Sequence, residues 1–231
     1  MVQLVAIAIP TLKIGIEQAS NPQQVSVFLQ ILFLLTVLSI APALLLMLTS
    51  FTRLIVVFSI LRHALGLQAT PPNQVLISLA LFLTFFIMAP VFMKAYDEGI
   101  KPYMEKKIDE KTLFEKVSAP FKAFMLKNTR EKDLALFVKL RGEPRPATPE
   151  DVSLLTLIPA FMISELKTAF QIGFLLYIPF LIIDLVVSTV LISMGILMLP
   201  PMMLSLPLKL LLFVLVDGWN LLIFSLVKSF H

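Results

Sequence analysis

The stretch FQIGFLLYIPFLIIDLVVSTVLISMGILMLPPMMLSLPLKLLLFVLVDGWNLLIFSLV, residues 170–227, decides the fold of this chain. Two long apolar runs are joined there by a break that contains Gly195, Pro200, Pro201 and Pro207, with methionines at 194, 198, 202 and 203. Inside a hydrocarbon layer, irregular backbone is tolerated only where protein buries it or where it lines a cavity. The break is therefore the first candidate for a functional site.

The composition of the chain is that of a membrane protein. Of its 231 residues, 58% are hydrophobic and 15% are charged, and the mean hydropathy is +0.92, well outside the usual balance of a soluble domain. The absence of cysteine excludes disulfides and thiol nucleophiles, and two histidines, His63 and His231, are too few for a metal cluster. The net charge of +4 is small, which argues against nucleic-acid binding. We therefore expect no cofactor and no nucleic-acid partner.

Four apolar runs approach the ~20 residues that a membrane-spanning helix needs, namely residues 25–48, 75–93, 170–199 and 206–227. A fifth apolar segment, residues 54–61, is too short to span and is predicted to be a turn or an interfacial helix. The expected fold class is an all-α membrane protein. Its expected parts are a tail (residues 1–24), a first hydrophobic hairpin (25–93), a small polar helical domain (94–164) and a second hydrophobic hairpin (165–231).

Positive charge in the short connections sets the expected orientation. Arg53 and Arg62 stand in the connection formed by residues 49–74, which has no acidic residue, whereas Lys13 in the N-terminal tail is offset by Glu17. This connection is expected in the cytoplasm, with the N-terminus and the polar domain outside. Residues 1–10 have no basic residue ahead of their apolar run, so a cleaved secretory signal is not expected.

The polar segment, residues 94–151, has the pattern of a small helical domain. Thr112, followed three residues later by Glu115, is typical of a capping box, and a second helix is expected from about residue 128. Thr148 ahead of Pro149 predicts a further helix start. A domain this small buries little surface alone. We therefore expect it to pack on the apolar segments or on other copies of the chain.

Five ionisable residues stand in or beside the last two apolar runs: Glu165, Lys167, Asp184, Lys209 and Asp217. Such residues are costly in a membrane and usually face a partner or a wet cavity. Structural ion pairing between helices is the more frequent role, and pairing with a neighbouring subunit is the other. Asp184 and Asp217 together would suit an intramembrane aspartyl protease, but neither stands in a GxGD sequence. A proton-coupled transporter using the same two carboxylates is a further alternative.

Several longer strings make the chain recognisable. Residues 165–174 (ELKTAFQIGF), 178–186 (IPFLIIDLV) and 207–219 (PLKLLLFVLVDGW) resemble the FliP family of export-gate proteins, whose injectisome relatives are called SctR. Residues 49–66 (TSFTRLIVVFSILRHALG) and 71–90 (PPNQVLISLALFLTFFIMAP) are similar to the first half of that family. The resemblance extends over nearly all of residues 30–230, and residues 124–136 (FMLKNTREKDLAL) favour the flagellar branch over the injectisome branch.

The resemblance implies a core subunit of the flagellar type III protein export gate, in the bacterial cytoplasmic membrane at the flagellar basal body. Members of the family assemble from broken helical hairpins into a ring, expected to be a pentamer, which forms a closed cone with FliQ and FliR. Unfolded flagellar subunits leave the cytoplasm through this cone, and other export-apparatus proteins supply the energy. The resemblance therefore implies a protein that is not an enzyme and whose partners are copies of itself, these proteins, the exported subunits and membrane lipid.

The family's methionine-rich gate loop maps onto the break between the last two runs. The residues implied to form the constriction are Met194, Gly195, Ile196, Leu197, Met198, Leu199, Pro200 and Pro201. The family commonly has a methionine run directly after the glycine, whereas Ile196 and Leu197 occupy two of those positions here. Methionines in an apolar chain are more often packing residues than mechanistic ones, so a flexible apolar seal is expected rather than a methionine-specific one. The charged residues, with Arg53 and Arg62, are expected to set subunit contacts or to line the path.

Overall fold

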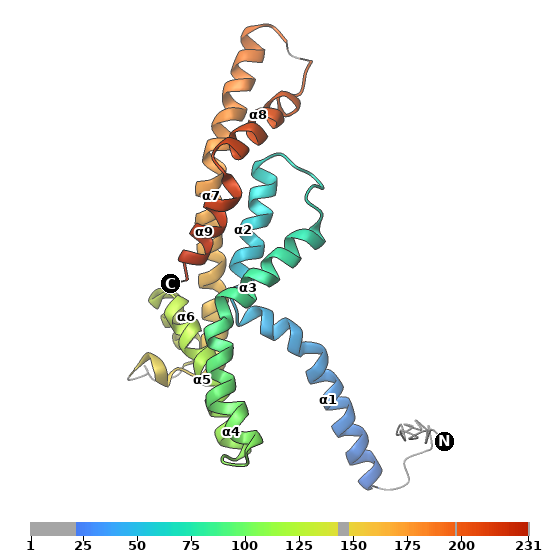
Figure 1. Cartoon of the computed structure of the whole chain (residues 1–231), viewed down its shortest axis with the longest axis vertical. Helices are drawn as coiled ribbons and strands as arrows, with labels where there is room; N and C mark the ends of the chain where they lie inside the picture. The colour runs from blue at the N-terminus through green and yellow to red at the C-terminus, as the bar shows by residue number, and fades with distance from the viewer. Residues whose placement is uncertain (1–21, 143–147, 197, 231) are drawn as a thin grey trace, which may run out of the picture. The chain divides into compact units, whose positions relative to one another are not determined.

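The computed structural model describes residues 22–142, 148–196 and 198–230, and all regular secondary structure in these ranges is helical. The chain divides into two compact units, residues 1–42 and 43–231. The predicted tail, residues 1–24, falls almost entirely outside the described ranges, as does part of the connection after residue 142. Figure 1 shows the course of the chain.

The first unit contains most of α1 (Pro22–Met47). Its large apolar side chains between Phe28 and Ile40 are exposed. The hydroxyls of Thr36 and Ser39 donate to the carbonyls of Leu32 and Leu35, one turn back along the same helix. These bonds satisfy the only polar side chains in that stretch apart from Gln30, so the helix presents a nearly continuous apolar surface.

The second unit is built around α7 (Leu154–Ser193), a helix of 40 residues that passes through Pro159 and Pro179 without a break. It crosses the expected boundary between residues 164 and 165. Helix α2 (Phe51–Ala64) packs on it, and α8 (Pro201–Leu215) and α9 (Gly218–Lys228) turn back beside it (Figure 1). Helix α3 (Asn73–Ala95) packs on α2 and continues through a π-helical turn, Tyr96–Ile100, into α4 (Lys101–Met104).

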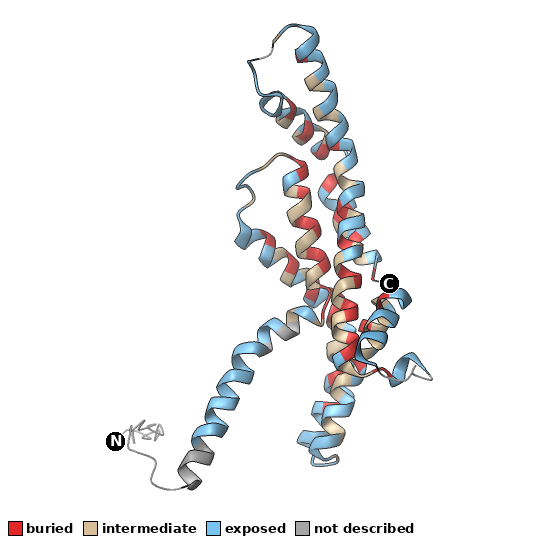
Figure 2. Cartoon of the chain, turned by 180° about the vertical axis from the view of Figure 1, so that it is seen from behind, coloured by how far each residue is buried: buried red, intermediate tan, exposed pale blue. Residues whose placement is uncertain are grey.

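Helix α2 is central, although its sequence predicted a turn or an interfacial helix. Leu54, Val57, Phe58 and Leu61 recur at helical spacing and are almost completely buried. They form the main core with side chains of α3, α7 and α9, and Figure 2 shows the buried residues concentrated along α2 and α7. The prediction of a turn is therefore wrong: a segment too short to span a membrane is instead a core helix.

The polar segment forms α5 (Glu110–Asn128), α6 (Glu131–Arg141) and a 3₁₀ turn at Pro149–Asp151. Helix α5 is capped by the carboxylate of Asp109, which accepts from the backbone N–H of Thr112 at 3.2 Å. The predicted cap at Thr112 is thus wrong by three residues, because Asp109 supplies the cap first. The capping box lies instead at Thr148 and Asp151.

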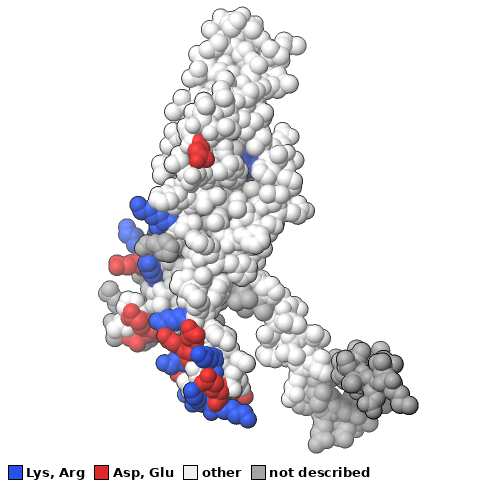
Figure 3. All heavy atoms as spheres, viewed as in Figure 1, with Lys and Arg blue, Asp and Glu red and all other residues white. Residues whose placement is uncertain are grey.

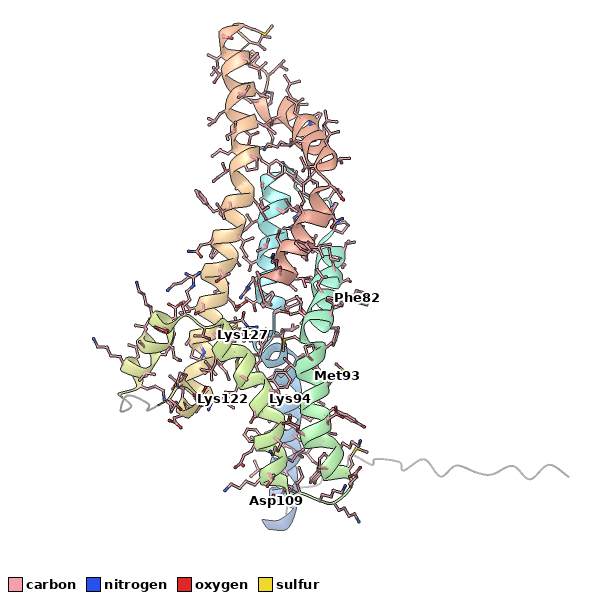
Figure 4. The ribbon with its side chains drawn as sticks, turned by 60° about the vertical axis from the view of Figure 1, so that its left-hand side comes forward. Phe82, Met93, Lys94, Asp109, Lys122 and Lys127 are labelled. Atoms are coloured by element: carbon pink, nitrogen blue, oxygen red, sulfur yellow. The ribbon has the colours of Figure 1, made fainter. Side chains whose placement is uncertain are left out.

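The polar segment packs on the first part of α7, as expected for a domain too small to stand alone. Met125, Val152, Leu157 and Phe161 form a second core between α5 and α7. Charged side chains gather over the polar segment, whereas most of the surface farther along α7 and α8 is uncharged in Figure 3. In Figure 4, the exposed Phe82 and Met93 project from α3, and Lys122 and Lys127 belong to α5. The second unit therefore has an apolar part and a charged part.

Within the described residues, two helices are long and apolar enough to cross a membrane: Asn73–Met104, and α7. Helices α8 and α9 would together make a third, but they are bent by 64° at the break between them. The predicted span at residues 206–227 is therefore not one straight helix. The first predicted run falls in α1, where the described apolar helix is the shorter Phe28–Ile40.

Candidate functional site

The candidate gate loop, residues 194–201, begins where α7 ends in a glycine-dependent cap. Gly195 has φ +74°, and its N–H donates to the carbonyl of Ile192 at 3.0 Å, while the N–H of Ile196 donates to the carbonyl of Leu191 at 2.9 Å. This pair of bonds is the Schellman motif, which needs a left-handed residue after the helix. An added Cβ on Gly195 would meet nothing within 4 Å, so the glycine is required by conformation and not by crowding.

Beyond this cap the loop is apolar and unusually exposed. Met198 is 95% exposed, and Met194, Leu199, Met202 and Met203 are also exposed large hydrophobic residues; Figure 2 shows the tip of the α7–α8 hairpin as mostly exposed. Leu197, one of the expected constriction residues, lies outside the described residues. Pro200 caps α8 and Pro201 is its first residue, a position that proline favours. The loop therefore presents flexible apolar side chains at the end of a long helix.

Five of the seven expected charged residues are held in ion pairs within the chain. Arg53 of α2 and Glu165 of α7 are 3% and 0% exposed at their side chains and form a two-pronged pair, with Arg53 Nε donating to Glu165 Oε2 at 2.8 Å and Nη2 donating to Oε1. A planar guanidinium suits this bidentate geometry. Arg53 also donates to the carbonyl and hydroxyl of Ser229 at 2.9 and 2.8 Å. The pair thus joins α2, α7 and the residues after α9.

Lys209 of α8 makes a second buried junction nearer the gate loop. Its ammonium is 2.6 Å from Oδ2 of Asp184 on α7 and donates to the carbonyl of Ala64, the last residue of α2, at 3.0 Å. The lysine therefore neutralises a carboxylate and also satisfies a carbonyl that the end of α2 leaves unpaired. Three helices meet at this one side chain, close to where α8 turns back along α7.

Lys167 of α7 pairs with Asp133 of α6, in the charged part of the unit. The hydroxyl of Ser164 donates to the other oxygen of Asp133 at 2.9 Å, and Ser164 in turn accepts from the backbone N–H of Arg130 at 3.0 Å. Both Ser164 and Asp133 are buried. This network attaches α6 to α7 through hydrogen bonds rather than through apolar contact alone.

Two of the expected residues are not in such pairs. Arg62 lies in the last turn of α2, and its guanidinium donates to Asn73 Oδ1 at 2.5 Å and to the carbonyl of Pro71 at 3.3 Å, while its buried Nε has no partner among the described residues. Asp217 lies at the bend between α8 and α9, in the left-handed region with φ +50° and ψ +51°. Its carboxylate is exposed and makes no hydrogen bond or ion pair with the residues that the structure describes.

No group of three His, Cys, Asp or Glu side chains within the described ranges could hold a metal ion. Asp184 is paired with a lysine, whereas an aspartyl protease needs two carboxylates that share a proton. What the arrangement supplies is an apolar loop on a hairpin that buried ion pairs hold together.

Sequence reasoning missed the residues that complete these junctions. Asp133, Ser164 and Ser229 each hydrogen-bond to a charged partner, but they stand in ordinary helical or terminal sequence. Asp133 is buried on α6, beside the partly buried Leu134, and the sequence alone does not indicate that burial. The partners are far apart in sequence, and one sequence by itself does not reveal pairings over such separations.

Comparison with known proteins gives a consistent result. The sequence model of the FliP family matches residues 34–226. The flagellar biosynthetic protein FliP of Bacillus subtilis is 55% identical over 217 residues, covering 94% of this chain and 98% of that protein. The proteins of the same name from Caulobacter vibrioides and Aquifex aeolicus are 56% and 52% identical, covering 87% and 88% of this chain and 76% and 86% of their own lengths. The chain with this apolar loop and these buried junctions therefore belongs to the FliP family.

Proposed function

We propose that the chain is the core pore-forming subunit of a flagellar type III protein export gate. In this function it passes unfolded flagellar subunits across the bacterial cytoplasmic membrane and catalyses no reaction. The observation that carries the proposal is the exposed apolar loop at residues 194–201, set at the end of a 40-residue helix in a chain of the FliP family. The relatives are named for flagellar biosynthesis, which favours this role over that of an injectisome subunit.

The proposed assembly is a ring, expected to be a pentamer, that forms a cone with FliQ and FliR and contacts other export-apparatus proteins. The exposed apolar surface of α3, α7 and α8 is compatible with it, because neighbouring subunits as well as lipid can cover those side chains in a membrane. In this arrangement the loops of neighbouring copies converge to form the constriction. We place the charged polar segment outside the cytoplasm, consistent with Arg53 and Arg62 in the segment that follows α1, which has no acidic residue.

The seal is proposed to depend on apolar bulk and flexibility. Methionine and leucine side chains adapt to irregular spaces, so converging loops can close against water and still reshape around a passing chain. Met198 is almost fully exposed in one copy, as expected of a residue whose contacts are made by neighbouring loops or by the exported chain. A rigid or polar loop would fulfil only one of these two requirements.

The test replaces residues 196–198 by three glycines, which removes the apolar bulk and keeps the loop length. The matched control replaces residues 105–107, in the exposed turn after α4, by three glycines. We expect the first variant to make membranes permeable to small ions and to change the secretion of filament subunits, and the control to do neither. If ion permeability and secretion both remain at the wild-type level in the first variant, the proposed seal is wrong.

A further inference from the structure

A groove opens between α7 and the bent pair α8 and α9. It has a volume of about 540 Å³ and is lined almost entirely by apolar side chains, among them Leu176, Phe180, Phe213, Val216 and Leu221. The bend at Asp217 creates it, because α9 leaves the direction of α8 by 64°. Gly218, directly after the bend, is packed so closely on the ring of Phe213 that a Cβ would lie 2.3 Å from it. The groove thus results from the bend between α8 and α9.

Exposed apolar side chains also flank the bend beside the groove. Val214, Leu215 and Phe224, on either side of the bend, are all more than half exposed. In a membrane, exposed apolar side chains beside an apolar groove are covered either by lipid or by another helix. An occupant that filled the groove alone would leave these three side chains uncovered, so the surface fits a helix better than a single acyl chain.

One exposed charge stands at the bend beside this groove. Asp217 stands between Val216 and Gly218, both of which line the groove, and its exposed carboxylate has no partner among the residues that the structure describes. The two other acidic residues of the segment 154–228 are already paired, Glu165 with Arg53 and Asp184 with Lys209. A carboxylate in apolar surroundings is stable only when a cation or hydrogen-bond donors neutralise it.

We propose that this groove is the docking site for an apolar helix of a neighbouring subunit, and that this helix carries one lysine or arginine that pairs with Asp217. The carboxylate sets the charge of the occupant, because it attracts a basic side chain and repels the phosphate of an anionic lipid. The apolar lining requires the rest of the occupant's contact surface to be apolar. Asp217 is then a residue that selects the partner, since an apolar helix without a cation would bury the carboxylate unpaired.

This inference rests on the proposed function, because it requires an assembly of several subunits. The variants are Asp217→Asn, which keeps the shape and removes the charge, and Asp217→Lys, which reverses it. The matched controls are Asp97→Asn and Asp97→Lys, at an exposed acid in the polar segment. We expect recovery of the detergent-extracted complex to fall by about tenfold or more for both Asp217 variants and to stay at the wild-type level for both Asp97 variants.

Two further measurements separate a lost contact from a misfolded chain. Motile revertants of the Asp217→Lys strain are expected to replace a lysine or arginine in an apolar helix of a neighbouring subunit by an acid. A photo-crosslinking amino acid at Leu221, in the groove, is expected to capture that same helix. The chain has no cysteine, so Asp217→Cys combined with a cysteine at the revertant position of the neighbour is expected to form a disulfide, which provides an independent check.

The outcomes distinguish a failure of the proposed docking site from a failure of the proposed export function. Wild-type recovery of the complex and normal motility with Asp217→Lys would overturn the docking site and leave the export function intact. Crosslinks from Leu221 to lipid alone, or to a helix with no basic residue, would also overturn it. If the wild-type chain forms no complex in the membrane, the proposed export function itself fails, whatever the variants do.

Discussion

At the scale of single residues, Asp133 shows how one buried carboxylate attaches the polar segment to α7. It is 2% exposed, and that burial, the largest influence, raises the pKa of Asp133. The hydrogen bonds from Lys167 and Ser164 and the charges of Lys167 and Arg130 act in the opposite direction and together outweigh it. The pKa of Asp133 therefore lies below its ordinary value, and its charged form stabilises the contact of α6 with α7.

The direction of this shift predicts how the contact responds to acid. A carboxylate whose pKa is lowered by folding contributes stability that is complete above its unfolded pKa and is lost as pH falls toward its folded pKa. We expect the amides of α6 to lose protection from hydrogen exchange, corrected for intrinsic rates, as pH falls below about 4. Asp133→Asn should lower protection at neutral pH and remove most of this acid response, whereas Glu131→Gln, at an exposed acid of α6, should keep it. An unchanged acid response in Asp133→Asn would contradict the assignment.

At the scale of elements, the contact of α2 with α7 depends on one close approach. A Cβ built on Gly173 would lie 2.4 Å from Cδ1 of Ile60 and 3.1 Å from its Cβ. The missing side chain therefore lets α2 and α7 approach at a distance that any larger residue would allow only if Ile60 shifted. Because Gly173 lies in the interior of a helix, its presence costs about 1 kcal/mol of helix propensity, a cost that the closer packing offsets.

This contact predicts the effect of a larger residue at position 173 and its partial rescue by a smaller residue at position 60. We expect Gly173→Val to destabilise the chain by about 1–3 kcal/mol, because overpacking outweighs the small gain in helix propensity. Adding Ile60→Ala should recover part of the loss, so that the two changes together cost less than their sum by roughly 1 kcal/mol. Phe174→Val, at an exposed neighbour on α7, should have little effect. Thermal unfolding of the purified chain in detergent measures all four, and strictly additive losses would contradict the steric explanation.

The same elements show what the sequence could predict and where it failed. Hydrophobic run lengths indicated the helices that became α1, α3 and α7, because length and apolarity are local properties. They could not indicate that residues 54–61 form a core helix, since its place depends on what packs against it. The bend at Asp217 was also missed, because a left-handed aspartate leaves no signal in an otherwise helical pattern. Glycine and the prolines, in contrast, marked the loop after α7 through their local conformational preferences.

At the scale of the whole second unit, Arg53 contacts segments that lie far apart along the chain. Its partners Asn128, Glu165 and Ser229 are 75, 112 and 176 residues away in sequence, and its guanidinium lies 3.7 Å from the centre of the Phe230 ring. That ring stacks on Phe124 of α5. Pairings at such separations are invisible to periodicity and motif arguments. Because of these contacts, the last described residues are part of the core and do not project from it.

Removing those residues should therefore affect the chain through Arg53. Deleting residues 229–231 leaves the guanidinium paired with Glu165 but without the acceptors of Ser229 and without the Phe230 ring, and leaving a buried donor unsatisfied costs roughly 1–3 kcal/mol. Arg53→Met should cost more, roughly 3–5 kcal/mol, because it leaves the buried carboxylate of Glu165 unpaired. In the combined variant the deletion should cost much less, since the charge that needed the terminal residues is gone. Lys228→Gln, at the end of α9, is the control and should change the unfolding temperature little. Equal costs of the deletion with and without Arg53 would show that the terminal residues act by packing alone.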